Sequence, residues 1–264
     1  MQICEECLQT KPRCMMCGIP MIGSTGSQVC ATCLSHAPRC AECGQPLTGR
    51  YFETEDQRRL CANCYHDAPA CDVCGRALNH ESWQLSDGRL ICAACHATAV
   101  YEPAEAVEIF GKIQALLIKM MGMHLNVPTG ILLVDRDELV RLCSSQIGEF
   151  FPPDALMGLY LRHGLRRAIY IQNALPQPVF AQVTAHEFGH AWQAENNPVM
   201  VNPLLREGFA EWVAFRLIEA LDLRSQMHWM MARNDVYGQG LRQMLEMEHR
   251  HGAEGVLKRI QLVR

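Results

Sequence analysis

The sequence predicts an α+β protein in two parts: a row of small metal-binding modules, then a mainly helical domain with a small sheet. Fourteen of the fifteen cysteines lie before residue 96, and all fourteen stand in Cys-x-x-Cys pairs. Beyond a boundary near residues 96–103 the composition shifts to helix formers. Short apolar runs typical of strands then alternate with amphipathic segments typical of helices. We therefore expect one domain over residues 1–97 and a second over residues 102–264.

The cysteine pairs form a repeat. Each copy opens with a pair whose second cysteine is followed by glycine (Gly18, Gly44 and Gly75) and closes with another pair. Two pairs supply the four thiolates of a tetrahedral structural zinc site, and reduced sulfur indicates a cytoplasmic location. We expect three such Cys4, zinc-ribbon-like modules, with these ligands: Cys14, Cys17, Cys30 and Cys33; Cys40, Cys43, Cys61 and Cys64; Cys71, Cys74, Cys92 and Cys95.

Two features of this region leave alternatives open. A cross-braced arrangement, in which alternate pairs share a metal, also uses every cysteine of the three copies, although it breaks their periodicity. Cys4 and Cys7 match the closing half of a unit, so this first unit is either incomplete or an idle remnant. His36, His66 and His96 follow closing pairs, and we expect them at the surface because four cysteines already complete each site.

Charge and hydropathy exclude several classes of partner. The formal net charge is −4, and residues 1–97 contain 8 Lys and Arg against 10 Asp and Glu. Without a basic stripe the modules are expected to bind protein and not nucleic acid. No basic start precedes an apolar run at Met1, and Lys119 interrupts the most apolar helical segment. We expect a soluble protein without a membrane partner.

The second part begins with a helix and a few short strands. Its elements are predicted as a helix over residues 104–123, a strand over 131–134, a helix over 137–143, and strands over 159–161 and 168–171. Cys143 reads as a small buried apolar residue. The last strand directly precedes the motif described next, and a sheet edge there is suited to hold an extended peptide.

Residues 185–190 carry the pattern on which the functional interpretation rests. His186 and His190 are four residues apart, so on a helix both side chains face one metal ion. Glu187 then reaches a water on that metal and is placed to act as a general base. An apolar stripe on another face gives this helix a core side. The helix is expected to end near residues 196–198, because asparagine tolerates a left-handed terminus and Pro198 cannot continue the helix.

A second helix is predicted to follow at once, with Asn202 as its cap and Pro203 in its first turn. Glu207 is the natural third metal ligand, and Glu211 the natural partner for the far nitrogen of a ligating histidine. The alternative is that both acids are solvated surface residues. Gly208 favours the first interpretation, because a glycine inside a helix suggests a close approach of another backbone.

Three later residues could stabilise an oxyanion: His228, Tyr237 and Arg242. Tyr237 is the preferred candidate because Gly238 and Gly240 follow it and allow close approach. The competing interpretation is an ordinary half-buried tyrosine.

These residues together resemble the LIM-linked metallopeptidases typified by the growth-limiting DA-one proteins of plants, which have bacterial relatives. The resemblance spans residues 104–264 and rests on these segments: 158–160, 168–171 with 175–176, 185–192, 207–208 and 237–240. It implies a zincin-like peptidase domain of the gluzincin type, preceded by LIM-like, treble-clef modules. It also implies zinc on His186, His190 and Glu207 with Glu187 as base, and ubiquitin or a ubiquitin-like protein as partner. A LIM unit carries a histidine ligand, whereas these modules offer only cysteines.

The sequence thus leads to the hypothesis of a zinc-dependent endopeptidase that hydrolyses peptide bonds in proteins, with one catalytic and about three structural zinc ions. One alternative is a non-catalytic adaptor, in which the peptidase-like fold is a platform beside the protein-binding modules. Another gives the modules a regulatory role as a cover over the cleft.

Overall fold

The computed structural model describes residues 11–21, 28–54, 57–78, 81–146, 156–163, 166–199 and 202–262. The chain is α+β and divides into two compact units. The first comprises Met1–Ser82 and Leu90–Cys92, and the second comprises Trp83–Arg89 and Ala93–Arg264. Residues 83–89 and 93–97, expected in the first part, therefore belong to the second unit. Cys4 and Cys7 lie outside the described residues.

The three copies of the cysteine repeat share the same local backbone structure. In each opening pair the following glycine has a positive φ, and its N–H donates to the carbonyl of the first cysteine, as for Gly18 and Cys14 at 2.8 Å. Closing pairs begin short helices, α2 (Ala31–His36), α3 (Ala62–Asp67) and α4 (Ala93–Ala97). Short strands precede the last two, β1 (Tyr51–Glu53) with β2 (Arg59–Cys61), and β3 (Ser82–Gln84) with β4 (Leu90–Cys92).

The second unit contains a three-stranded sheet in the order β6-β8-β7. Strand β6 (Thr129–Val134) runs parallel to β8 (Arg166–Gln172), whereas β7 (Gly158–His163) is antiparallel to β8. These strands are the ones the sequence predicts, and helix α6 (Arg136–Gln146) follows β6 as expected. The last predicted strand, β8, lies in the middle of this order, so the sheet edge expected there is wrong. Strand β7 is at the end of the order, so one of its edges is open among the described strands.

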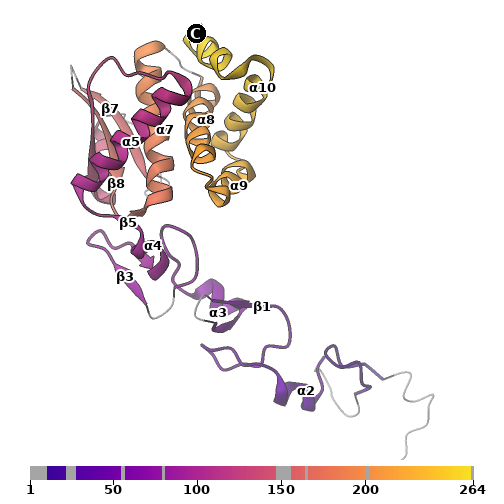
Figure 1. Ribbon diagram of the computed structural model, residues 1–264. Coiled ribbons are helices and arrows are strands. Elements are labelled where there is room, and N and C mark those ends of the chain that lie inside the picture. Colours follow the sequence, from indigo (N-terminus) through magenta and orange to yellow (C-terminus); the bar gives the residue numbers. More distant parts are fainter. Residues whose placement is uncertain are drawn as a thin grey trace, which may run out of the picture. The chain divides into compact units, whose positions relative to one another are not determined.

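A small two-stranded sheet leads into helix α7. Strand β5 (Ala99–Val100) pairs antiparallel with β9 (Leu175–Pro176), and α7 (Gln177–Asn196) begins directly after β9. Helix α5 (Pro103–Met121) matches the predicted helix and buries Phe110, Ile113 and Leu117. Figure 1 shows α7 between the β7–β8 side of this unit and α8 (Pro203–Ala220).

Helices α7, α8 and α10 (Val236–Leu262) pack in sequence against one another, and α9 (Arg224–Ala232) lies against α8 and α10 (Figure 1). Glycines allow the closest approaches. A Cβ on Gly208 would lie 2.6 Å from the Cα of Gly240, and one on Gly189 would lie 2.8 Å from the Cα of Ala210. The close approach expected at Gly208 is confirmed, and the backbone concerned is that of α10.

The ends of α7 and α8 follow most of the predicted signals. Asn202 caps α8, with its side chain accepting from Leu205 N at 3.2 Å, and Pro203 occupies the first turn. Helix α7 ends at Asn196, within the predicted region, and its C-cap residue Asn197 has a φ of −149°, so the left-handed terminus that asparagine tolerates is not formed there. Its buried side chain instead donates from Nδ2 to the carbonyl of Ile260 at 2.8 Å, so a tertiary contact fixes this residue.

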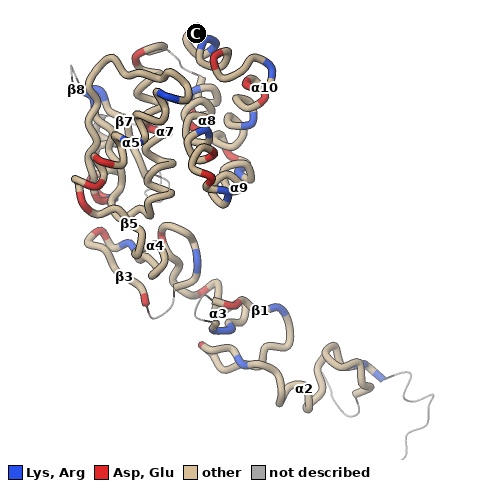
Figure 2. Tube along the Cα trace, viewed as in Figure 1, with Lys and Arg blue, Asp and Glu red and all other residues tan. Residues whose placement is uncertain are grey.

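Two general properties bear on partners. Among the described residues no helix is both long and apolar enough to cross a membrane. Figure 2 shows basic and acidic residues interspersed along the described chain of the first unit, without a continuous basic stripe.

Candidate metal centre and thiolate sites

Three side chains from α7 and α8 converge on one point, and they are the three that the sequence predicts as ligands. The Nε2 atoms of His186 and His190 are 3.1 Å apart, and Glu207 Oε2 lies 3.4 Å and 3.2 Å from them, respectively. Ligand atoms bound tetrahedrally at about 2.0–2.1 Å from zinc lie about 3.3 Å from each other. The three atoms therefore already have the spacing of one face of a zinc tetrahedron.

Glu207 and Glu211 of α8 are both buried, at 9% and 3% exposed, which argues against solvated surface residues. Glu211 Oε2 lies 3.0 Å from Nδ1 of His186, in the role predicted for it. The other histidine has a partner that the sequence analysis did not identify: Nδ1 of His190 lies 2.9 Å from Oε1 of Gln193. Gln193 in turn donates to the carbonyl of Arg206 at 3.0 Å. Each far nitrogen thus has a hydrogen-bond partner that fixes its ring.

The charges of the centre are strongly coupled. Burial lowers the pKa of His186, but hydrogen bonds to Glu207 and Glu211 outweigh burial and raise that pKa to about 10. For Glu207, burial raises the pKa, whereas the two histidines outweigh it and hold the pKa well below its usual range. The carboxylate therefore stays ionised and attracts positive charge, whether protons on the imidazoles or a bound cation.

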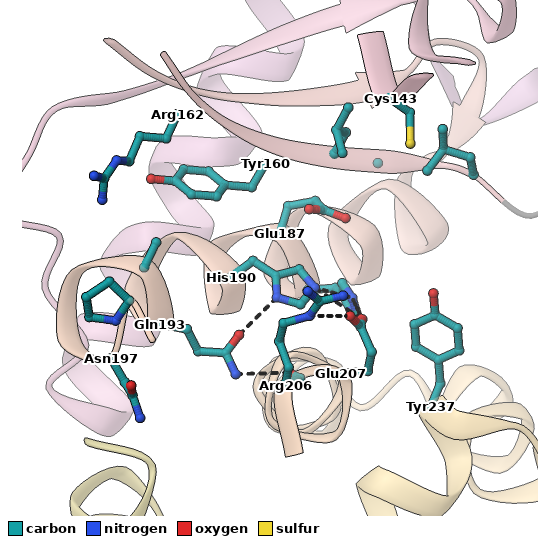
Figure 3. Close-up of a pocket in the computed structure, with 16 residues that line it drawn as sticks. Cys143, Tyr160, Arg162, Glu187, His190, Gln193, Asn197, Arg206, Glu207 and Tyr237 are labelled. Carbon is teal, nitrogen blue, oxygen red and sulfur yellow. Dashed lines mark hydrogen bonds and ion pairs between the residues drawn. The ribbon is translucent and has the colours of Figure 1, made fainter. Parts of the chain in front are cut away.

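Glu187 lies beside the triangle of ligands, on the side of β7 (Figure 3). Its side chain is 7% exposed, and burial raises its pKa. Gly158 allows strand β7 to reach it, because a Cβ at Gly158 would lie 2.9 Å from Glu187 Oε1 and 2.6 Å from Val183 Cγ1. The backbone N–H of Tyr160 donates to the Glu187 carboxylate. The Glu187 carboxylate is thus held between the candidate metal ligands and an edge strand.

The centre opens into a cavity of about 340 Å³ that α7, α8, β7 and the start of α10 line together. Tyr237 lines it opposite the strand, with its ring centroid 5.7 Å from that of His186 (Figure 3). Burial raises the pKa of Tyr237 to about 12, helped by Glu207 and Glu187.

His228 and Arg242 are not among the lining residues. Cys143 is buried as expected, and it also lines this cavity.

The twelve described cysteines of the repeat form three groups in the sequential pairing that the repeat predicts, which excludes the cross-braced arrangement among them. The Sγ atoms of Cys17 and Cys30 are 3.8 Å apart, as are those of Cys74 and Cys92, while Cys43 and Cys61 are separated by 3.9 Å. Four sulfurs at about 2.3 Å from zinc would be about 3.8 Å apart. His36, His66 and His96 belong to none of the groups.

Hydrogen bonds preorganise the thiolate groups. In each, the N–H of the first closing cysteine donates to the first sulfur of the copy, at 3.3 Å for Cys30 and 3.4 Å for Cys61 and Cys92. The Cys30 N–H lowers the pKa of Cys14 to about 6, and N–H donors outweigh burial to lower the pKa of Cys40 likewise to about 6. The residues present therefore fit soft, thiolate-binding metals such as zinc.

Comparisons of the chain with protein-family models, with curated proteins and with solved structures give no match.

Proposed function

We propose that this protein is a zinc-dependent endopeptidase with one catalytic zinc on His186, His190 and Glu207 and three structural zinc ions on the cysteine groups. One observation carries the proposal. The three ligand atoms have the mutual distances of ligands in a zinc tetrahedron. The buried carboxylate of Glu187, from the same helix as the two histidines, lies beside them and lines the same cavity. Three protein ligands leave one position for water, which is the arrangement of catalytic and not of structural zinc.

The chain's own residues have clear roles in this reaction. Bound zinc would bring the pKa of its water to about 7 and polarise the scissile carbonyl. Glu187 takes a proton from the attacking water and later delivers it to the leaving amine, and its raised pKa favours the first transfer because it makes the carboxylate a better proton acceptor. Tyr237 keeps its proton at neutral pH because its pKa is about 12, so its hydroxyl can donate a hydrogen bond to the developing oxyanion.

Strand β7 supports a polypeptide as the substrate. It is the terminal strand of the β6-β8-β7 sheet, and Gly158, Leu159, Tyr160 and Arg162 line the cavity. An extended peptide that pairs with this edge would gain main-chain hydrogen bonds that do not depend on its sequence. It would also pass directly over Glu187, because Gly158 abuts that side chain.

The resemblance to LIM-linked metallopeptidases supports the same proposal and adds a gluzincin fold. The proposed location, the cytoplasm, rests on the cysteine groups. In this proposal the cysteine modules bind protein, either the substrate or a ubiquitin-like partner. Their pairs of thiolates require reduced sulfur, which agrees with a reducing compartment.

The decisive substitution is Glu187→Gln. It keeps the size of the side chain but removes the base, so we expect unchanged zinc content and a loss of cleavage of at least 100-fold, as for removal of a general base. New amino termini in a proteome incubated with each protein would be mapped by mass spectrometry. Cleavage by the variant at the wild-type rate would refute the role of Glu187.

The same measurement separates the peptidase from the non-catalytic adaptor. An adaptor predicts no new amino termini with either protein, even when four zinc ions are bound per chain. Glu207→Ala serves as the matched metal control: we expect it to remove one zinc and leave the three on cysteine.

A further inference from the structure

Arg233 connects two parts of the candidate centre that come from different helices. It stands between α9 and α10, and its side chain is 21% exposed. The guanidinium carbon lies 4.4 Å from the ring centroid of Tyr237 and 4.8 Å from that of Trp229. A planar cation between two aromatic faces is held by cation–π attraction, and it limits where the Tyr237 ring can lie.

The same guanidinium faces the carboxylate that orients His186. Its Nη1 lies 3.6 Å from Oε1 of Glu211, the oxygen that does not contact the histidine. That oxygen is buried and has no hydrogen-bond partner among the described residues. A buried carboxylate is strongly disfavoured without a nearby cation, and Arg233 supplies that cation on the side of Glu211 away from His186, which helps to hold the other oxygen on the histidine.

Arg233 is itself fixed by its surroundings. Asp235 accepts from its Nη2 at 2.7 Å and from its Nε at 3.0 Å. The other oxygen of Asp235 accepts from the Gly238 N–H at 3.0 Å, which ties the first turn of α10 to the same group. Arg242 donates to the Arg233 carbonyl at 2.8 Å. The guanidinium is therefore fixed by several contacts at once and has little freedom to move.

We propose that Arg233 is a positioning residue with two arms: through Glu211 it sets the orientation of His186 and thereby the metal affinity, and through its stacking it sets the position of Tyr237 and thereby the rate. The Tyr237 arm rests on the proposed peptidase function. The Glu211 arm does not, because metal affinity can be measured without cleavage.

The test of the first arm is a double-mutant cycle on the affinity for the zinc ion that Glu207→Ala removes, measured by chelator competition. We expect Arg233→Gln to weaken this affinity about tenfold, as partners of metal ligands do. In a Glu211→Gln background the same substitution should have little further effect, because there is no longer a carboxylate to hold. Equal losses in both backgrounds would overturn this arm.

The test of the second arm is kinetic. Arg233→Gln is expected to lower kcat with little change in KM, and to cost much less in a Tyr237→Phe background. Arg233→Lys should restore most of the zinc affinity, since it keeps the charge, but little of the rate, since an ammonium cannot stack as a guanidinium does. If Arg233→Lys is as weak in metal binding as Arg233→Gln, charge is not the cause and the proposal fails.

Arg224→Gln is the matched control, because Arg224 lies at the start of α9 and pairs only with exposed Asp222 among the described residues. It should change neither affinity nor rate, and thermal unfolding of all variants would show that each folds. Absence of cleavage in every protein, with a non-additive zinc cycle, would refute the peptidase and the Tyr237 arm but keep the Glu211 arm.

Discussion

The two histidines of the candidate centre are oriented by chemically different partners. His186 is paired with a carboxylate, Glu211, and His190 with a neutral amide, Gln193. A carboxylate strengthens its histidine as a ligand, whereas an amide mainly fixes the tautomer and the ring plane. The centre thus combines one imidazole held by a carboxylate and one held by an amide with the carboxylate of Glu207. With a divalent ion, the three ligands and Glu211 make an almost neutral buried group.

Gln193→Leu tests the amide at the scale of a single residue. Loss of the hydrogen bond to Nδ1 frees the His190 ring, so we expect the affinity for the catalytic zinc to fall roughly 10- to 100-fold. Chelator competition would measure it. Gln182→Leu is the control, because Gln182 is a buried glutamine of the same helix that does not line the cavity. Equal affinities in the two variants would show that Gln193 has no orienting role.

At the scale of elements, the proposed catalysis depends on the close approach of strand β7 to helix α7. Gly158 is the point of contact, since any side chain there would overlap Val183 and Glu187. The same approach lets Tyr160 donate its N–H to the Glu187 carboxylate. The position of the strand proposed to hold a substrate and the position of the helix that carries the proposed base are therefore linked.

Gly158→Ala should separate metal binding from catalysis. The new Cβ forces β7 or Glu187 to shift, and small misplacements of catalytic groups cost roughly 10- to 100-fold in kcat/KM. Zinc affinity should not change, because all three ligands belong to α7 and α8. Gly130→Ala on β6 is the control, since no atom lies within 4 Å of the position its Cβ would take. A wild-type kcat/KM for Gly158→Ala would contradict this account of the strand.

At the scale of the whole molecule, the second unit extends further towards the amino terminus than the cysteine repeat suggests. Asp87 and Arg89 form an ion pair with both side chains 1% exposed. Arg89 also donates to the carbonyl of Asn173 at 3.0 Å, and Asp87 accepts from the Arg136 N–H at 2.9 Å. These contacts hold the turn after β8, just before α7. Removing residues 1–97 to test for a regulatory cover would therefore also remove part of the second unit.

Asp87 gives this packing a dependence on pH. Burial raises its pKa, but the hydrogen bonds from Arg89 outweigh burial and lower it below the usual value. A carboxyl group with a lowered pKa in the folded state stabilises the fold above its unfolded pKa, and this stability is lost as pH falls through the folded pKa. Stability should therefore decline in acid below about pH 4.

Asp87→Asn should remove that decline and lower the free energy of unfolding at pH 7 by about 3–5 kcal/mol, because Arg89 remains buried and unpaired. Denaturant unfolding at pH 7 and pH 3 would measure both effects. Asp222→Asn breaks an exposed pair and should cost less than about 1 kcal/mol. A similar small cost for Asp87→Asn would mean that the buried pair does not stabilise the second unit.

The sequence by itself determined the candidate metal ligands and most of the helices and strands. Four-residue spacing on a helix makes His186 and His190 face the same way, and short Cys-x-x-Cys turns make two sulfurs converge, so local geometry is enough. Helix caps such as Asn202 act within one turn, so they too can be predicted from the sequence. The conformation of Asn197 could not be predicted in this way, because its side chain donates to the carbonyl of Ile260, far along the chain.

Only the tertiary structure decided which distant groups surround those ligands. The approach of Gly158 to Glu187, the contact of Arg233 with Glu211, and that of Arg89 with Asn173 all join different segments. Periodicity tells which face of an element is apolar, but not which residue of another element will lie against it. That choice follows from packing the helices and the sheet at close distance, where a glycine or a buried charge is accepted only if its partner fits.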